Sequence, residues 1–287
     1  MYKKIVAGTD LSETSKIAVR RAAMLAEQLG ASLTLVHVGS DPGAPLAELA
    51  TQNGAEAVVV EGNPPTALLA QADELGADLL VVGSVGMSGA KRFALGNVPN
   101  KVSHQSSRDL LIVKTDTGRR ADTPYQKILV GADGSGTAMR AVEMASELAS
   151  KLGVAPTVVT VFEGPSEHEL DQMRVGTNEV VAAWHATKEQ RETPPEYQWK
   201  IASAAQADDV LERAADHAAK FDVEPETRAV PGHPAEKLLE IAEDENFDLI
   251  CVGGVGMSGT ARFALGNVPH RLSHHAPTDI LILQTTR

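Results

Sequence analysis

Short apolar runs alternate with amphipathic stretches along the whole chain. Runs that are apolar on both faces are typical of parallel strands covered by helices on both sides of a sheet. The first half contains five of them: KIVAG (4–8), SLTLVHV (32–38), EAVVV (56–60), DLLVVG (78–83) and DLLIV (109–113). The pattern predicts an α/β sheet of about five strands per half, connected by right-handed helical crossovers.

The stretch after the first run of each half has the spacing of one helical face. Its apolar positions are Ala18, Ala22, Leu25 and Leu29 in the first half, and Ala141, Ala145, Leu148 and Leu152 in the second. Each stretch follows a D-x-S-x-T pattern that begins at Asp10 or Asp133, and ends at Gly30 or Gly153. Serine and threonine favour a helix N-cap and glycine favours a C-terminal stop, so we expect one helix in each place.

The chain repeats itself internally. KKIVAGTDLSETSKIAV (3–19) matches QKILVGADGSGTAMRAV (126–142) at an offset of 123 residues, whereas VGSVGMSGAKRFALGNVPN (82–100) returns 170 residues later with four of nineteen positions changed. The larger offset places 47 additional residues in the second half. We expect two domains, 1–116 and 125–287, joined by a polar linker at 117–124, with an insertion at about 163–206. We expect the insertion to be a surface excursion, followed by a crossover helix over 208–220.

Composition excludes several classes of protein. The formal charge of −12 and the aromatic content of 3% disfavour nucleic acid and anionic membranes as partners. No apolar run approaches the length of about 18 residues that a membrane span needs. The single cysteine, Cys251, lies in an apolar run and is expected to be a buried strand residue. We expect a cytoplasmic protein.

A glycine-rich loop follows the fourth apolar run of each half. Its spacing is G-x2-G-x9-G-N, formed by Gly83, Gly86 and Gly96 in the first half and by Gly253, Gly256 and Gly266 in the second. Glycine lets the backbone approach a ligand closely, and the NVP that follows predicts a helix start with asparagine as the N-cap. Free N–H groups at a helix start attract anions, so the loop predicts a phosphate site. The alternative is a turn that only lets a helix pack closely on a strand.

Other candidate groups carry weaker signals. Arg92 and Arg262 recur inside the loops, either as phosphate contacts or as solvated charges. His270, His274 and His275 lack an accompanying acid or cysteine cluster, so we predict no metal site. The sequence shows no P-loop and no Ser-His-Asp, Cys-His or paired-carboxylate pattern. We predict no catalytic residue.

These motifs resemble the universal stress protein family in its tandem-domain form, in the branch that binds ATP. The resemblance covers nearly the whole chain apart from the insertion. It implies two Rossmann-like (adenine nucleotide alpha hydrolase-like) domains, each a parallel sheet with strand order 3-2-1-4-5, paired through the fifth strands as an intramolecular pseudo-dimer. The implied ligand is ATP or AMP, with Mg²⁺, and two such chains could associate further as a homodimer.

The resemblance also assigns site residues. In the first half, adenine and ribose would contact Thr9, Asp10 and Val38, and the ribose and phosphates would contact Gly83, Gly86, Gly96, Asn97 and Val98. The matching residues of the second half are Ala132, Asp133, Val161, Gly253, Gly256, Gly266, Asn267 and Val268. Two departures from the family pattern stand out: Asn97 and Asn267 replace serine or threonine, and Ala132 lacks the hydroxyl of Thr9.

The function expected from these residues is that of a nucleotide-dependent stress or regulatory factor with at most weak ATPase activity. An ATP-dependent enzyme of the same fold, such as an adenylating enzyme, is one alternative. The early glycine-serine phosphate motif of such enzymes is absent here, where the chain has AGTDLSET and GADGSGTA. A scaffold with vestigial nucleotide sites is the other alternative.

Overall fold

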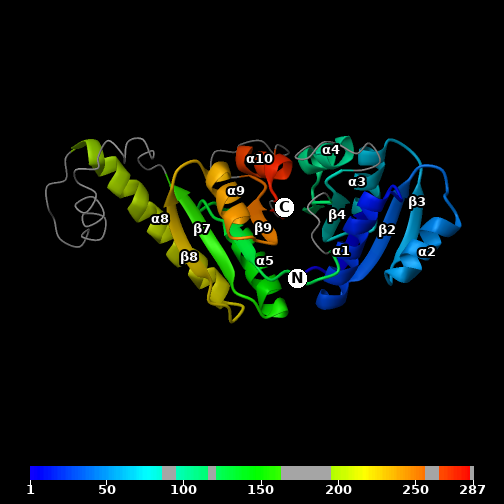
Figure 1. The fold of residues 1–287 in the computed structure, drawn as a ribbon, viewed down its shortest axis with the longest axis horizontal. Helices are drawn as coiled ribbons and strands as arrows, with labels where there is room; N and C mark the ends of the chain where they lie inside the picture. The colour runs from blue at the N-terminus through cyan, green and yellow to red at the C-terminus, as the bar shows by residue number, and fades with distance from the viewer. Residues whose placement is uncertain (86–94, 116–120, 163–194, 256–264, 285–287) are drawn as a thin grey trace.

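The computed structural model of the chain describes residues 1–85, 95–115, 121–162, 195–255 and 265–284. They form one ten-stranded sheet with helices on both faces. Figure 1 shows the two halves side by side along the long axis of the molecule, with both chain ends near the middle.

The first half contains all five predicted strands. They are β1 (Lys4–Gly8), β2 (Ser32–Val38), β3 (Glu56–Val60), β4 (Leu79–Gly83) and β5 (Asp109–Val113). The helices between them are α1 (Glu13–Leu29), α2 (Ala44–Gln52), α3 (Pro64–Glu74) and α4 (Asn97–Gln105). The Ser12 side chain caps α1 by accepting from the Ser15 N–H, and Gly30 ends it with a left-handed φ of 63°. Both ends of α1 therefore agree with the sequence prediction.

The second half repeats this order. Its strands are β6 (Ile128–Gly131), β7 (Pro156–Phe162), β8 (Glu226–Pro231), β9 (Leu249–Gly253) and β10 (Asp279–Leu283). Its helices are α5 (Gly136–Leu152), α8 (Pro195–Ala219), α9 (Pro234–Asp244) and α10 (Asn267–His275). Ser135 and Gly153 cap α5 as their counterparts cap α1.

Helix α8 is longer than the sequence analysis predicted. It begins at Pro195 rather than near residue 208, so part of the expected surface excursion is helical. The reason is local: no glycine or proline follows Pro195 in this stretch, and alanine, the strongest helix former, recurs along it. The remainder of the expected excursion, including Trp184, lies outside the described residues.

Each half has the strand order 3-2-1-4-5, with all neighbours parallel. This confirms the predicted Rossmann-like fold. One apolar cluster lies under α1, α2, α5 and α8, and a second lies under α3, α4, α9 and α10. The two helical layers cover both faces of the sheet, which explains why the strands are apolar throughout.

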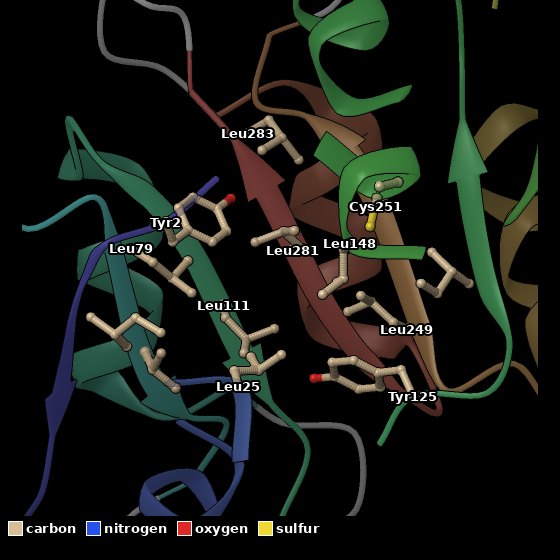
Figure 2. Packing of buried hydrophobic residues seen from close by; sticks show 14 of the residues in the cluster. Tyr2, Leu25, Leu79, Leu111, Tyr125, Leu148, Leu249, Cys251, Leu281 and Leu283 are labelled. Atoms are coloured by element: carbon tan, nitrogen blue, oxygen red, sulfur yellow. The ribbon is translucent and has the colours of Figure 1, made fainter. Parts of the chain in front are cut away.

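The halves join through their fifth strands. β5 and β10 pair antiparallel, with Leu111 opposite Leu281, and these two side chains are only 1% and 2% exposed. Figure 2 shows both leucines inside the junction, with Tyr2 and Tyr125 on either side of them. The expected intramolecular pairing through the fifth strands is confirmed.

Two buried aspartates hold this junction, and the sequence analysis did not predict them. Asp109, the first residue of β5, accepts hydrogen bonds from Tyr2 Oη (3.0 Å), from the Gln284 N–H (2.9 Å) and from both Nη atoms of Arg140 (2.7 Å each). Tyr2 belongs to the same half, whereas Gln284 and Arg140 belong to the other. The carboxylate is therefore satisfied only when the two halves meet.

The second aspartate repeats the arrangement. Asp279 begins β10 and accepts from Tyr125 Oη (2.8 Å) and from the Lys114 N–H of the other half (2.8 Å), with Arg21 Nε at 3.2 Å. Burial, followed by the charge of the neighbouring aspartate, raises the pKa of Tyr2 and of Tyr125 well above its usual value. Both phenols therefore stay neutral donors.

We predict that Asp109→Ala destabilises the protein by about 2–4 kcal/mol, because it leaves the half-buried Arg140 charge, the buried Tyr2 hydroxyl and the Gln284 N–H without their acceptor. Urea unfolding measures the change. Glu236→Ala is the control, because it removes an exposed ion pair with Arg271 (3.0 Å) and should leave the unfolding curve nearly unchanged. Equal effects of the two substitutions would show that the Asp109–Arg140 pair does not hold the junction.

Candidate functional site

The predicted site residues gather at the carboxyl ends of the strands. In the order 3-2-1-4-5 the chain direction of the connections reverses between β1 and β4, and α/β sheets bind ligands at such a point. Asp10 follows the end of β1 and Gly83 ends β4. Asp133 and Gly253 occupy the matching places after β6 and at the end of β9.

Each aspartate is built into a tight turn. Asp10 Oδ1 accepts from the Ser12 N–H at 3.0 Å, and Asp133 Oδ1 accepts from the Ser135 N–H at the same distance. Because Ser12 and Ser135 are the N-caps of α1 and α5, each carboxylate is fixed to the start of a helix. This places one carboxylate at the rim of each half.

The Thr9 side chain takes part in the same turn. Its hydroxyl lies 3.0 Å from Ser15 Oγ and accepts from the Leu11 N–H at 3.1 Å, which helps hold Leu11 at a left-handed φ of 63°. The second half has Ala132 and Ala138 in place of the two hydroxyl residues, and Gly134, with a φ of 83°, in place of Leu11. Glycine adopts that conformation without help. The missing hydroxyl of Ala132 is therefore matched by a change in the turn.

The ends of each glycine loop are held together at a neck. The Gly96 N–H donates to Ser84 O (2.8 Å) and the Ser84 N–H donates to Val113 O (2.8 Å). In the second half, the Gly266 N–H donates to Gly254 O (2.8 Å). The loop residues between, including Gly86, Gly256, Arg92 and Arg262, lie outside the described residues.

The expected asparagine caps are wrong. Gly96 and Gly266 are the N-caps of α4 and α10, in extended conformation, and Asn97 and Asn267 are the first helical residues, followed by Val98 and Val268. No side chain among the described residues caps either helix. The N–H groups of the first turn are thus not satisfied by a cap, which is the arrangement that an anion can use.

The loop glycines differ in what they do for packing. A Cβ at position 253 would lie 2.8 Å from Thr137 Oγ1, so this glycine lets α5 approach β9. A Cβ at position 83 or 96 would be 3.4 Å from its nearest neighbours, an ordinary contact. Gly96 also has a φ of −65°, which any residue adopts. The packing interpretation therefore explains Gly253 but not Gly96.

The other wall of each site lies at the end of the second strand. Val38 and Val161 are there, as expected. His37, directly before Val38, donates from Nδ1 to Thr9 O (3.0 Å), and the sequence analysis missed it. Its signal was an ionisable residue inside an apolar run. The second half has Thr160 at the position of His37. Phe162, directly after Val161, packs on Ala207 of α8.

Other groups in the described residues offer no competing site. Cys251 is fully buried in β9, and burial raises the pKa of its thiol. In the described part of the chain, no group of three or more His, Cys, Asp or Glu side chains is placed to hold a metal ion. A cleft of about 500 Å³ opens near the starts of β4 and β5, but Arg140 and Arg108 on its wall already pair with Asp109 and Asp73. None of the described helices is long and apolar enough to cross a membrane.

The fold and its two rims define a tandem Rossmann-like α/β protein. The model of the universal stress protein family matches residues 1–57, 46–114 and 124–284. The chain belongs to the universal stress protein family.

Relatives of known sequence agree. A universal stress protein of Mycobacterium tuberculosis is 32% identical over 165 residues, which is 56% of this chain and 98% of the relative. One from Mycolicibacterium smegmatis is 26% identical over 98% of this chain and 96% of its own length. The crystal structure of a universal stress protein from Archaeoglobus fulgidus shares the fold across 98% of both chains, with 19% identity and a TM-score of 0.62.

We predict that Gly253→Ala destabilises the protein by about 1–3 kcal/mol, because its Cβ would overlap Thr137. Gly83→Ala, the same change at the matching position, should cost less than about 1 kcal/mol, since its Cβ has room. Urea unfolding of the two variants compares them directly. Similar losses in both would contradict the different packing of the two loops.

Proposed function

We propose that the protein binds adenine nucleotides, ATP or AMP, at the glycine loops of both halves and acts as a nucleotide-dependent regulatory factor. Gly96 is the observation that carries this proposal. Neither packing nor backbone conformation requires glycine there, although it caps a helix whose first N–H groups have no side-chain partner. Close approach of a phosphate is a requirement that does explain it.

The remaining assignments follow from position. Asp10 and Asp133 would hold ribose hydroxyls, and the strand ends at Val38 and Val161 would border adenine. Gly83, Gly86 and Val98, with their counterparts Gly253, Gly256 and Val268, would surround the phosphates, and the exposed Asn97 and Asn267 amides would donate to phosphate oxygens. Mg²⁺ would be held mainly by the phosphates, because it keeps most of its water and needs only one or two carboxylates.

A regulatory role fits this site better than efficient catalysis. Each rim carries an aspartate fixed by its own turn, a geometry suited to holding hydroxyl groups rather than activating water. We place the protein in the cytoplasm, because its charge of −12 and its single buried cysteine fit that compartment. The same charge disfavours nucleic acid as a partner.

We predict that Gly96→Glu weakens ATP binding at the first site by about tenfold or more, because a carboxylate would repel the phosphates. Isothermal titration calorimetry should show the stoichiometry falling from two to one, and to zero when Gly266→Glu is added.

Gly96→Gln is the matched control for this experiment, since it adds the same bulk without the charge. Gly96→Ala, whose Cβ has room, tests whether the fold tolerates a side chain there. An unchanged ATP affinity in the Gly96→Glu, Gly266→Glu double variant would refute the nucleotide assignment.

A further inference from the structure

Histidines gather where α4 of the first half meets α10 of the second. The ring centroids of His104 and His270 lie 5.3 Å apart across the junction, those of His270 and His274 lie 4.8 Å apart, and those of His274 and His275 lie 6.2 Å apart. Figure 1 shows α4 and α10 next to each other near the middle of the molecule. Four ionisable rings thus lie in a row, and the His104–His270 contact joins the two halves.

The surroundings of the cluster do not stabilise protonated histidine rings. His270 Nδ1 and His274 Nε2 are inaccessible to solvent and make no hydrogen bond to any described residue. A protonated imidazole has two N–H donors, so protonation would leave a buried donor without an acceptor. The neutral rings suit this environment, and the charged rings do not.

The surrounding charges make protonation harder still. Lys114, from the segment after β5, is buried beneath the cluster and donates from Nζ to Ser273 O at 2.8 Å. On the helices themselves, Lys101 and Arg271 add further positive charge. The nearby acids on the neighbouring helices already bind arginine: Glu236 of α9 binds Arg271 (3.0 Å) and Asp73 of α3 binds Arg108 (2.8 Å).

We propose that this histidine cluster is an acid-sensitive latch between the halves: the neutral rings let α4 and α10 pack together, and protonation drives the two helices apart. Because Gly96 and Gly266 are the N-caps of α4 and α10, loosening these helices would also move the first turns that we assign to phosphate. This consequence at the loops rests on the proposed nucleotide site. The latch itself does not.

The direction of the pH dependence follows from the pKa values. Burial, followed by the charge of His270, lowers the pKa of His104, and burial with the neighbouring histidines and Lys114 lowers that of His274. The unfolded chain therefore takes up these protons first as the pH falls below about 6.5. The stability that the neutral rings provide is complete above that pH and is lost below it.

The test is urea unfolding at pH values of about 7.5 and 5.5, which bracket the unperturbed histidine pKa. The triple variant His104→Gln, His270→Asn, His274→Gln removes three of the four rings, including both that meet across the junction. Asparagine is suited to position 270, because the matching residue in the first half is Asn100. His233→Gln, an exposed histidine before α9, is the control.

Acidification from about pH 7.5 to about pH 5.5 should raise the unfolding equilibrium constant of the wild type and of the control. The increase should be at least about tenfold larger than in the triple variant, because each linked proton changes this constant by up to tenfold per pH unit. Titration of the ring protons by NMR should show His104 and His274 protonating below the usual histidine pKa of about 6.5. Equal pH dependence of wild type and triple variant, or titration of His104 and His274 at the usual histidine pKa, would overturn the latch.

ATP affinity at the two pH values then tests the link to the loops. It should weaken on acidification more in the wild type than in the triple variant, and equal weakening would refute that link. If ATP fails to bind at either pH, the proposed function fails, while unfolding and NMR still decide the latch.

Discussion

The junction between β5 and β10 depends on two carboxylates that neither half can satisfy alone. A buried charge is tolerated only when it is paired and hydrogen-bonded. Asp109 accepts hydrogen bonds from Tyr2 of its own half and from Arg140 and the Gln284 N–H of the other half. Asp279 likewise accepts from Tyr125 of its own half and from the Lys114 N–H of the other. Separating the halves would expose the apolar seam around Leu111 and Leu281 and leave both charges without most of their partners. The continuous ten-stranded sheet follows from this requirement.

The parts of this architecture that depend on local pattern could be predicted from the sequence. Apolar runs fixed the strands, and the serines and glycines around α1 and α5 fixed the ends of those helices. The partners of Asp109 could not be predicted this way, because Arg140 is 31 residues away and Gln284 is 175 residues away. Asn97 was predicted as the N-cap because asparagine often caps helices. In the structure Gly96 has the extended backbone conformation of an N-cap residue, and Asn97 is already helical.

The positions of the candidate site residues in the fold could be predicted from the sequence better than their hydrogen bonds could. The rims lie where the aspartates and glycines indicated, but the sequence did not show that Thr9 bonds to its own turn. That use is visible only with Ser15 and Leu11 beside it, and the second half changes all three positions, to Ala132, Ala138 and Gly134. In this turn, therefore, the two copies of the repeat differ by three substitutions that compensate for one another.

Three consecutive residues connect the first glycine loop to the junction. Val113 O accepts from Ser84 at the neck of the loop, the Lys114 N–H donates to Asp279 of the other half, and the Thr115 N–H donates to Ser84 Oγ at 3.3 Å. The second half repeats two of these bonds, from Gly254 to Leu283 O and from the Gln284 N–H to Asp109.

A ligand that shifts a loop neck can therefore act on a bond that crosses the junction. If ligand binding changes the stability of the junction, thermodynamic linkage requires that a change at the junction alter ligand affinity by the same factor. Lys114 also donates from its side chain to Ser273 O of α10. It therefore links Asp279 to the helix that carries three of the clustered histidines, and its two chain neighbours hold the neck of the first loop. This contiguity is the physical reason to expect the two halves to respond to the proposed ligand as one unit.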